Sequence, residues 1–307
     1  MRLGTFLACL TAAPYLMGAN QPPLRLQPSS PWVVDYAENS CRLVRRFGEG
    51  KDETKLGFES EAPGEMDMVV TGRPLETYEA DINAQFLPVG GRPFLGHVGR
   101  TSDTNVPAIL WSQPHFLPDA LADKLKEEAK DRAKGPRVRP PAVDLAKEER
   151  IKSERKKFVA AITEVALQPS RKRDVILETG SLGPAMAEMD KCSEDSLKDW
   201  GVDPALEKKI VRPVWSINPS GWLYESDYPR ELIIQGAESV IEVRLLIDAA
   251  GRVTKCTPLS HYEQTEFNKI TCARIAERAR FEPAELADGT KVPSYVTRRV
   301  FWRIARR

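Results

Sequence analysis

Residues 224–304 read YESDYPRELIIQGAESVIEVRLLIDAAGRVTKCTPLSHYEQTEFNKITCARIAERARFEPAELADGTKVPSYVTRRVFWRI, and their pattern predicts the fold of the last quarter of the chain. Within it, apolar residues alternate with Glu242 and Arg244. The apolar members of this alternation are Ile241, Val243, Leu245 and Ile247. A period of two predicts a half-buried strand whose charged side chains lie on the other face.

A turn and a second strand follow directly. The turn ends at Gly251, a residue free to adopt positive φ, and residues 252–257 continue as a strand. The two strands therefore form an antiparallel hairpin. Residues 265–280 change to helical spacing. The side chains expected to pack on the sheet are Cys272, Ile275, Ala276 and Ala279, and those expected to point away are Arg274, Glu277, Arg278 and Arg280. A final strand over 294–304 completes a strand-strand-helix-strand unit of about 80 residues.

Several short motifs in this unit occur in a characteristic order. They are the pair Tyr228-Pro229, Gly236, the D-x-x-G-x-V turn that contains Gly251, the R-F-x-P-A helix exit that contains Phe281 and Pro283, and Gly289. In order and spacing, the unit resembles the C-terminal domain of TonB-type energy transducers. The chain departs from the family at 259–261 and at 267–268, which affects the geometry of that loop. The resemblance covers residues 224–307, about the last quarter of the chain.

The resemblance implies a function. Such domains bind a short peptide of an outer-membrane receptor, the TonB box, by adding it as a strand to a sheet edge, and they transmit force from inner-membrane motor proteins. Here the final strand is expected to be that edge. Its inner face is Val296, Val300, Trp302 and Ile304, and its peptide-binding outer face is Tyr295, Thr297, Arg299, Phe301 and Arg303. Arg298 interrupts the apolar alternation and is expected near the sheet margin. The arginines either attract an acidic receptor segment or only discourage edge-to-edge pairing, and both interpretations stay open.

The length predicts two domains, and the pattern of strands and helices along the chain predicts an α+β fold. The chain has 307 residues, 41% hydrophobic content and a net charge of +1, so no global field favours nucleic acid. The expected organisation is a signal peptide at 1–19, a leader at 20–31, a β-rich N-terminal domain at 32–201, a linker at 202–223 and the C-terminal domain at 224–307. Within the N-terminal domain, the charged segment at about 118–160 is expected to be a solvated helical insertion. The alternative is a contact surface for peptidoglycan or an acidic partner.

Six short apolar runs predict an antiparallel sheet at the start of the N-terminal domain: 32–34, 41–44, 55–58, 66–70, 82–87 and 107–111. A hairpin of 162–168 with 174–178 and a helix at 184–200 are expected to follow. The prolines of 202–223 favour a semi-extended linker.

The first 19 residues read MRLGTFLACLTAAPYLMGA, a basic residue and an apolar run that ends in small residues. This pattern is typical of a secretory signal peptide and predicts a periplasmic protein. The alternative is an uncleaved anchor in the inner membrane with the chain facing the periplasm.

Four cysteines remain after removal of the signal peptide, an even number that suggests disulfides in an exported chain. Cys256 lies on the second strand of the hairpin and Cys272 on the helix expected to cover it, so these two are expected to pair. Cys41 would then pair with Cys192. Four free thiols in a cytosolic protein are the alternative. With no C-x-x-C spacing and three histidines, the sequence predicts no metal site.

The sequence contains no catalytic motif and predicts neither an enzyme nor a cofactor. Residues 178–181 read ETGS, close to the D-T-G-S of aspartic proteases, but glutamate stands where the catalytic aspartate must be. We therefore expect an exported peptide-binding protein associated with TonB-dependent transport. The alternatives are a full energy transducer with an uncleaved anchor and a structural protein that binds peptidoglycan. Homodimer formation is left open.

Overall fold

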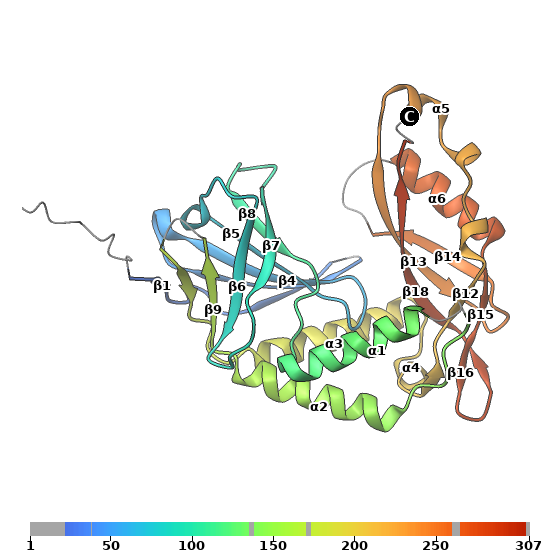
Figure 1. The fold of residues 1–307 in the computed structure, drawn as a ribbon, viewed down its shortest axis with the longest axis horizontal. Helices are drawn as coiled ribbons and strands as arrows, with labels where there is room; N and C mark the ends of the chain where they lie inside the picture. Colours follow the sequence, from blue (N-terminus) through green and yellow to red (C-terminus); the bar gives the residue numbers. More distant parts are fainter. Residues whose placement is uncertain (1–21, 38, 135–137, 170–172, 260–264, 305–307) are drawn as a thin grey trace, which may run out of the picture.

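The computed structural model describes residues 22–304 of the chain, apart from residues 38, 135–137, 170–172 and 260–264. The fold is α+β, with two hydrophobic cores that belong to an N-terminal and a C-terminal unit (Figure 1). The predicted signal peptide at 1–19 lies outside the described residues.

The N-terminal unit is built on one large, mostly antiparallel sheet, in which ten strands are described in the order β1-β10-β9-β6-β7-β8-β5-β4-β3-β2. A bridge between Pro28 and Phe47 links the chain just after β1 to the end of β3. The strands are β1 Leu24–Leu26, β2 Val33–Tyr36, β3 Cys41–Phe47, β4 Thr54–Ser60, β5 Asp67–Gly72, β6 Asp81–Leu87, β7 Phe94–Arg100, β8 Pro107–Trp111, β9 Glu164–Gln168 and β10 Val175–Leu177. Each run predicted as a strand in this region overlaps one of them.

Two strands of this sheet were not expected. The supposed leader contributes β1, which pairs in parallel with β10 and buries Leu26 in the core. The glycine-containing strand β7 lies between β6 and β8. Its Gly96 is required by a close approach, because a Cβ there would lie 2.3 Å from the indole ring of Trp111. Glycine weakens the pattern of a strand in the sequence but makes room here for the largest fully buried side chain.

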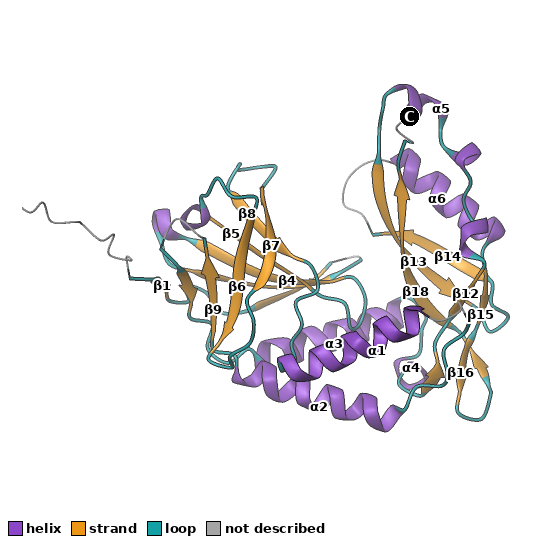
Figure 2. Cartoon of the chain, viewed as in Figure 1, coloured by secondary structure: helices purple, strands orange, loops and turns teal. Residues whose placement is uncertain are grey.

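Helices of the N-terminal unit lie together below the sheet in the view of Figures 1 and 2. They are α1 Asp119–Lys134, α2 Leu145–Ala161 and α3 Gly183–Asp199. Helix α3 packs against β3 and α2, and its Cys192 forms a disulfide with Cys41 of β3, with 6.0 Å between their Cα atoms. The predicted helical insertion thus corresponds to α1 and α2.

The C-terminal unit contains a three-stranded antiparallel sheet in the order β14-β13-β18, covered on one face by helix α6 (Figure 1). The bounds are β13 Ser239–Ile247, β14 Val253–Pro258, α6 Thr265–Arg278 and β18 Ser294–Trp302. The four residues of the predicted apolar face of β13 are all buried. The predicted pair Cys256–Cys272 is a disulfide that ties β14 to α6, with 5.5 Å between the Cα atoms.

The segment predicted as a linker at 202–223 is part of the C-terminal unit. Its strand β11 (Ile210–Arg212) pairs with β16 (Ala284–Leu286), and β12 (Trp215–Ile217) pairs with β15 (Arg280–Glu282). Trp222 is buried in the C-terminal core. Proline suits short edge strands as well as linkers, so the sequence did not distinguish the two. The remaining elements are η1 Gly50–Asp52, η2 Arg73–Leu75, α4 Pro204–Glu207, η3 Pro219–Gly221, η4 Glu225–Asp227, α5 Arg230–Ile234 and β17 Lys291–Val292.

The buried face of α6 differs from the predicted one. Phe267, Thr271 and Ile275 are fully buried, whereas Ala276 is exposed. Arg274 and Arg278, which were expected to point away, turn instead to the buried Asp227. The helix ends at Arg278, and residues 280–282 form β15 rather than a last helical turn.

Candidate peptide-binding edge

Strand β18 lies at the edge of the C-terminal sheet. It pairs with β13 along its whole length, from Ser294 opposite Ile247 to Trp302 opposite Ser239. On its other side, no strand pairs with it among the residues that the structure describes. An edge of nine residues is long enough to accept an added strand.

The direction of the backbone groups along β18 follows from its register. The N–H of Leu259 donates to the carbonyl of Glu242 at 2.8 Å. The backbone groups of Glu242 therefore point toward β14 and away from β18. Its partner Arg299 must then direct its own N–H and C=O away from β13, since the groups of a non-hydrogen-bonded pair point apart. Alternation extends this to Tyr295, Thr297 and Phe301. These residues, predicted from the resemblance, present their backbone groups at the open edge.

One of these edge carbonyls already has a partner. Arg298, on the inner face of β18, donates from Nη1 to the carbonyl of Thr297 at 2.7 Å. Its Nε and Nη2 contact Ser216 Oγ of β12 at 3.2 and 2.8 Å. The arginine that interrupts the apolar alternation thus lies at the sheet margin, as expected. Its side chain occupies one backbone acceptor of the open edge.

The inner face of β18 is anchored by an aromatic cluster. Trp302 donates from Nε1 to Thr271 Oγ1 at 2.9 Å, and its ring lies 5.3 Å from that of Phe267. Tyr228 of the Tyr-Pro motif packs edge-on against Trp302 at 5.2 Å, and its hydroxyl donates to the carbonyl of Ala237. Val296 and Val300 pack at the margin of this core, and Ile304 is partly buried. Pro229 precedes α5 directly and so ends the extended approach to it.

The turn and helix-exit motifs fit together. Gly251 has φ of +77°, and a Cβ on it would come within 1.9 Å of the carbonyl oxygen of Phe281. The N–H of Phe281 donates to the carbonyl of Gly251 at 2.9 Å, and Pro283 packs over the same turn. Phe281 itself is buried against Trp222, with ring centroids 5.0 Å apart. Only glycine fits this position, which explains the spacing of the two motifs.

The outer face of β18 is less open than predicted. The ring of Tyr295 packs against that of Trp200, at the end of α3, with 5.4 Å between centroids. Burial raises the pKa of Tyr295 well above its usual value. Thr297 donates from Oγ1 to the carboxylate of Glu65 at 2.7 Å. The N-terminal unit therefore covers the start of this face.

The far half of the outer face remains open. Arg299 is exposed and forms an ion pair of 2.9 Å with Glu242 on the neighbouring strand. Phe301 is 56% exposed, and the guanidinium of Arg303 lies 5.4 Å from its ring centroid. Of the five predicted outer-face residues, Arg299, Phe301 and Arg303 are available to a partner in this arrangement.

Arg244 of β13 is the centre of the contact between the units. It was expected on the exposed face, yet it is only 4% exposed. Its guanidinium donates to the carbonyls of Asn39 and Glu61 at 3.4 and 3.2 Å and to Asn39 Oδ1 at 3.1 Å. Burial lowers the pKa of Arg244 to about 10, although the neighbouring Glu61 opposes this change. The outer face of the sheet is thus an interface between the units.

Glu61, in the turn between β4 and β5, carries the carboxylate that acts on Arg244, and further carboxylates lie near Glu61. Burial, followed by the charges of Glu242, Glu59, Asp67 and Glu65, raises the pKa of Glu61 to about 7. Burial also raises the pKa of Asp67. This part of the interface therefore changes charge near neutral pH.

A second arginine that links the units belongs to the N-terminal unit and has its partners in the C-terminal unit. Arg139, in the connection between α1 and α2, forms ion pairs of 3.2 and 2.9 Å with Glu282 and Glu285 of the C-terminal unit. It also donates to the carbonyl of Pro283 at 2.6 Å. The helical insertion therefore contacts the C-terminal unit through its connecting segment.

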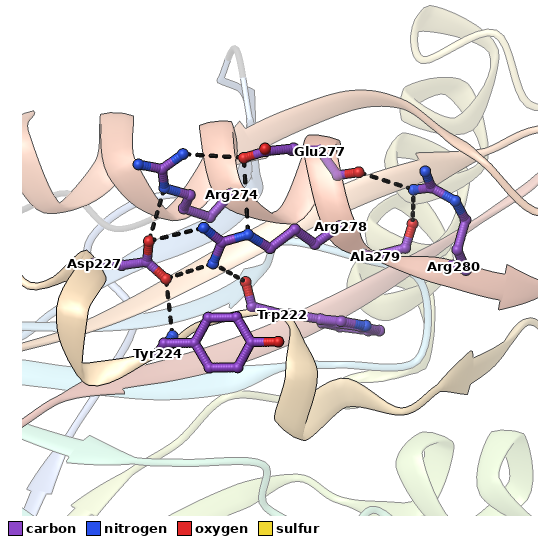
Figure 3. A network of polar contacts seen from close by, with 8 residues as sticks. All are labelled: Trp222, Tyr224, Asp227, Arg274, Glu277, Arg278, Ala279 and Arg280. Carbon is purple, nitrogen blue, oxygen red and sulfur yellow. Dashed lines mark hydrogen bonds and ion pairs between the residues drawn. The ribbon is translucent and has the colours of Figure 1, made fainter.

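Asp227 lies in a network of polar contacts with Tyr224, Arg274 and Arg278, as Figure 3 shows. Its side chain is 4% exposed and lies 2.8 Å from Arg274 Nε and 2.5 Å from Arg278 Nη1. It also accepts from the N–H of Tyr224 at 2.8 Å. The hydrogen bond from Arg278 is the main cause that lowers the pKa of Asp227. This network fixes η4 and the Tyr-Pro motif against α6.

The residues that the sequence did not single out share one property. Arg244, Glu65, Asp227 and Arg139 are charged, and their partners lie far away in the chain. Charged residues on a period-two pattern predict a solvated face, so no local signal marks a face covered by another unit. Only Asp227 had a local signal in the sequence that could have marked it, because it directly precedes the Tyr-Pro motif.

None of the helices in the described part of the chain combines the length and the apolar character that a membrane span requires. Likewise, the described His, Cys, Asp and Glu side chains include no group of three arranged to hold a metal ion.

Comparison with known proteins addresses the C-terminal unit. No curated protein matches the chain. Residues 224–304 match the family model described as Gram-negative bacterial TonB protein C-terminal. That segment begins at the Asp227 network and ends with the edge strand, so its bounds follow the structural unit apart from β11 and β12. The match connects the chain with TonB-type transport in the cell envelope. Residues 224–304 are a domain of the TonB C-terminal family, joined here to an N-terminal unit that the match does not cover.

Proposed function

We propose that this chain is an exported, periplasmic protein whose C-terminal unit binds an extended segment of an outer-membrane receptor by strand addition to β18. The observation that carries the proposal is the nine-residue edge, whose backbone groups at Tyr295, Thr297, Arg299 and Phe301 are directed outward. Main-chain hydrogen bonds supply affinity in this mode of recognition, and neighbouring side chains supply specificity. The disulfides Cys41–Cys192 and Cys256–Cys272 support an oxidising compartment.

Proline substitution at the edge tests this proposal. Arg299→Pro removes an N–H that faces outward, and an edge strand tolerates proline where the N–H is not part of the ladder. The matched control Arg299→Ala loses the same ion pair with Glu242 but keeps the N–H. We expect both variants to fold, as seen by circular dichroism, and only Arg299→Pro to lose binding of receptor peptides at least ten-fold. Equal binding by the two folded variants would rule out strand addition at this edge.

A full energy transducer with an N-terminal anchor is the alternative function, and inner-membrane motor proteins would then be further partners. The mature mass of the protein isolated from an envelope fraction separates the two. Loss of about 19 residues, the length of a signal peptide, supports the periplasmic protein. Retention of these residues in a membrane fraction supports the anchored transducer.

A further inference from the structure

We infer that Glu65 of the N-terminal unit selects the charge of the strand added to β18, and that it favours a basic or uncharged side chain opposite Thr297. The inference rests on the proposed function and specifies the chemistry of its partner. It depends on where the turn between β4 and β5 crosses the C-terminal sheet.

The turn runs across the sheet from β13 towards the edge. Arg244 and Thr297 are opposite each other in the register of β13 and β18. The carbonyl of Glu61 accepts from Arg244 on β13, and the carboxylate of Glu65 accepts from Thr297 on β18. Glu61 and Glu65 thus lie over two neighbouring strands at the same level, with Glu65 on the side of the open edge.

An added strand would continue this row. The residue directly opposite Thr297 has its side chain on the same face as Thr297, with about 5 Å between the Cβ atoms. That face is the one on which Glu65 lies. The incoming side chain at this level therefore becomes a neighbour of the Glu65 carboxylate.

The hydrogen bond to Glu65 brings no opposite charge. Its donor is the uncharged hydroxyl of Thr297, at 2.7 Å from the carboxylate. Two arginines on this face have other direct partners. Arg299 pairs with Glu242 and interacts with the charge of Glu65 only more weakly, and Arg244 donates to Asn39 and Glu61. An acidic side chain opposite Thr297 would be repelled by the Glu65 carboxylate, and a basic one could form an ion pair with it. This reverses the preference expected from the arginines of β18 alone.

A peptide library tests the inference on the full-length chain. It consists of labelled extended peptides in which lysine, glutamine or glutamate is placed at each position in turn. Members that bind wild type but not Arg299→Pro define edge-dependent binding. Among them, we expect one position at which lysine binds roughly five-fold more tightly than glutamate.

Variants at Glu65 locate the cause. Glu65→Gln keeps an acceptor for Thr297 and should abolish the preference, and Glu65→Lys should invert it. The matched control is Glu188→Lys, an equal charge change on the exposed side of α3, which should leave the preference unchanged. Edge-dependent binders that show no charge preference, or a preference that Glu65→Lys does not alter, would overturn the inference but not the proposed function. The lack of any edge-dependent binder would overturn both.

Discussion

The guanidinium carbon of Arg244 lies 3.6 Å from the ring centroid of Trp200, and this contact joins the two units of the chain. The arginine belongs to the middle strand of the C-terminal sheet, and the tryptophan follows the last turn of α3. A cation over an indole ring is stabilising, most strongly where water is excluded. The arginine also donates to two carbonyls and an amide of the N-terminal unit, so its side chain is held on several sides.

Replacement of Arg244 should therefore weaken the contact between the units. Arg244→Ala leaves acceptors at Asn39 and Glu61 without their donor and removes the contact with Trp200, at a cost of about 2–4 kcal/mol. We expect a lower urea midpoint and faster cleavage by trypsin at Lys208 and Lys209. Arg230→Ala, on the exposed side of α5, is the control and should change stability by less than about 0.5 kcal/mol. Equal protease resistance in wild type and Arg244→Ala would show that the contact does not hold the units together.

The contact should loosen as pH rises. The folded-state pKa of Glu61 is about 7, above its ordinary value of 4.5, because burial and the carboxylates of Glu242, Glu59, Asp67 and Glu65 disfavour its charged form. A raised acid pKa gives stability that is fully present below about 4.5 and is lost as pH rises through 7. Arg244, which also faces Glu61, opposes this effect.

Glu61→Gln isolates that effect. The variant cannot ionise, so it should gain stability relative to wild type between pH 5.5 and 8, by on the order of 1 kcal/mol after solvent screening. Thermal melts of both proteins across this range give the comparison. A difference between the two proteins that is constant with pH would mean that Glu61 does not titrate here.

The sequence predicted the C-terminal unit well because its signals are local. Alternation in β13, helical spacing in α6 and the glycine at 251 depend on neighbours in the chain. The edge position of the last strand was instead implied by the resemblance to the family, and β18 lies at the edge of its sheet. The predicted exposure of Arg244 on β13 and of the Tyr295 and Thr297 side chains on β18 was wrong because a second unit covers them. Its contacting residues Asn39 and Glu65 precede Arg244 and Thr297 by 205 and 232 residues.

The N-terminal unit shows a different limit. Strands such as β4 and β5 have clear alternation, but β7 contains Gly96, which the indole of Trp111 requires. Strand β1 has only three residues and follows prolines, so its pairing with β10 depends wholly on the rest of the sheet. Tertiary packing determined both elements, and short-range propensity could not reveal them.

Asp227 should be a main determinant of stability in the C-terminal unit. Asp227→Ala leaves Arg274 and Arg278 beside an apolar site and removes the acceptor for the Tyr224 N–H, at a cost of roughly 3 kcal/mol. Glu277→Ala, which removes an exposed partner of Arg274, is the control and should have little effect. Chemical unfolding followed by tryptophan fluorescence measures both. A smaller loss for Asp227→Ala than for Glu277→Ala would contradict the role assigned to the network.

The two disulfides should differ in their contribution. In the chain-entropy model a bridge across 151 residues, as in Cys41–Cys192, is worth about 5 kcal/mol, and one across 16 residues, as in Cys256–Cys272, about 3 kcal/mol. Paired alanine variants, Cys41→Ala with Cys192→Ala and Cys256→Ala with Cys272→Ala, allow the comparison in urea. The first pair should destabilise the N-terminal unit more than the second destabilises the C-terminal unit. The reverse order would show that native strain or residual structure outweighs loop length.

Arg298 should limit access to the edge that we propose as the binding site. Its Nη1 donates to the carbonyl of Thr297, an acceptor that an added strand would need. Arg298→Met keeps the apolar stem and leaves the backbone ladder to β13 intact, but it frees that carbonyl. We expect peptide affinity to rise several-fold, or the chain to self-associate through β18, as seen by fluorescence anisotropy and sedimentation. Ser216→Ala is the control, because it removes a different partner of Arg298 without freeing Thr297. If Arg298→Met stays folded and binds peptide more weakly than wild type, the arginine contributes to binding and does not block strand addition at the edge.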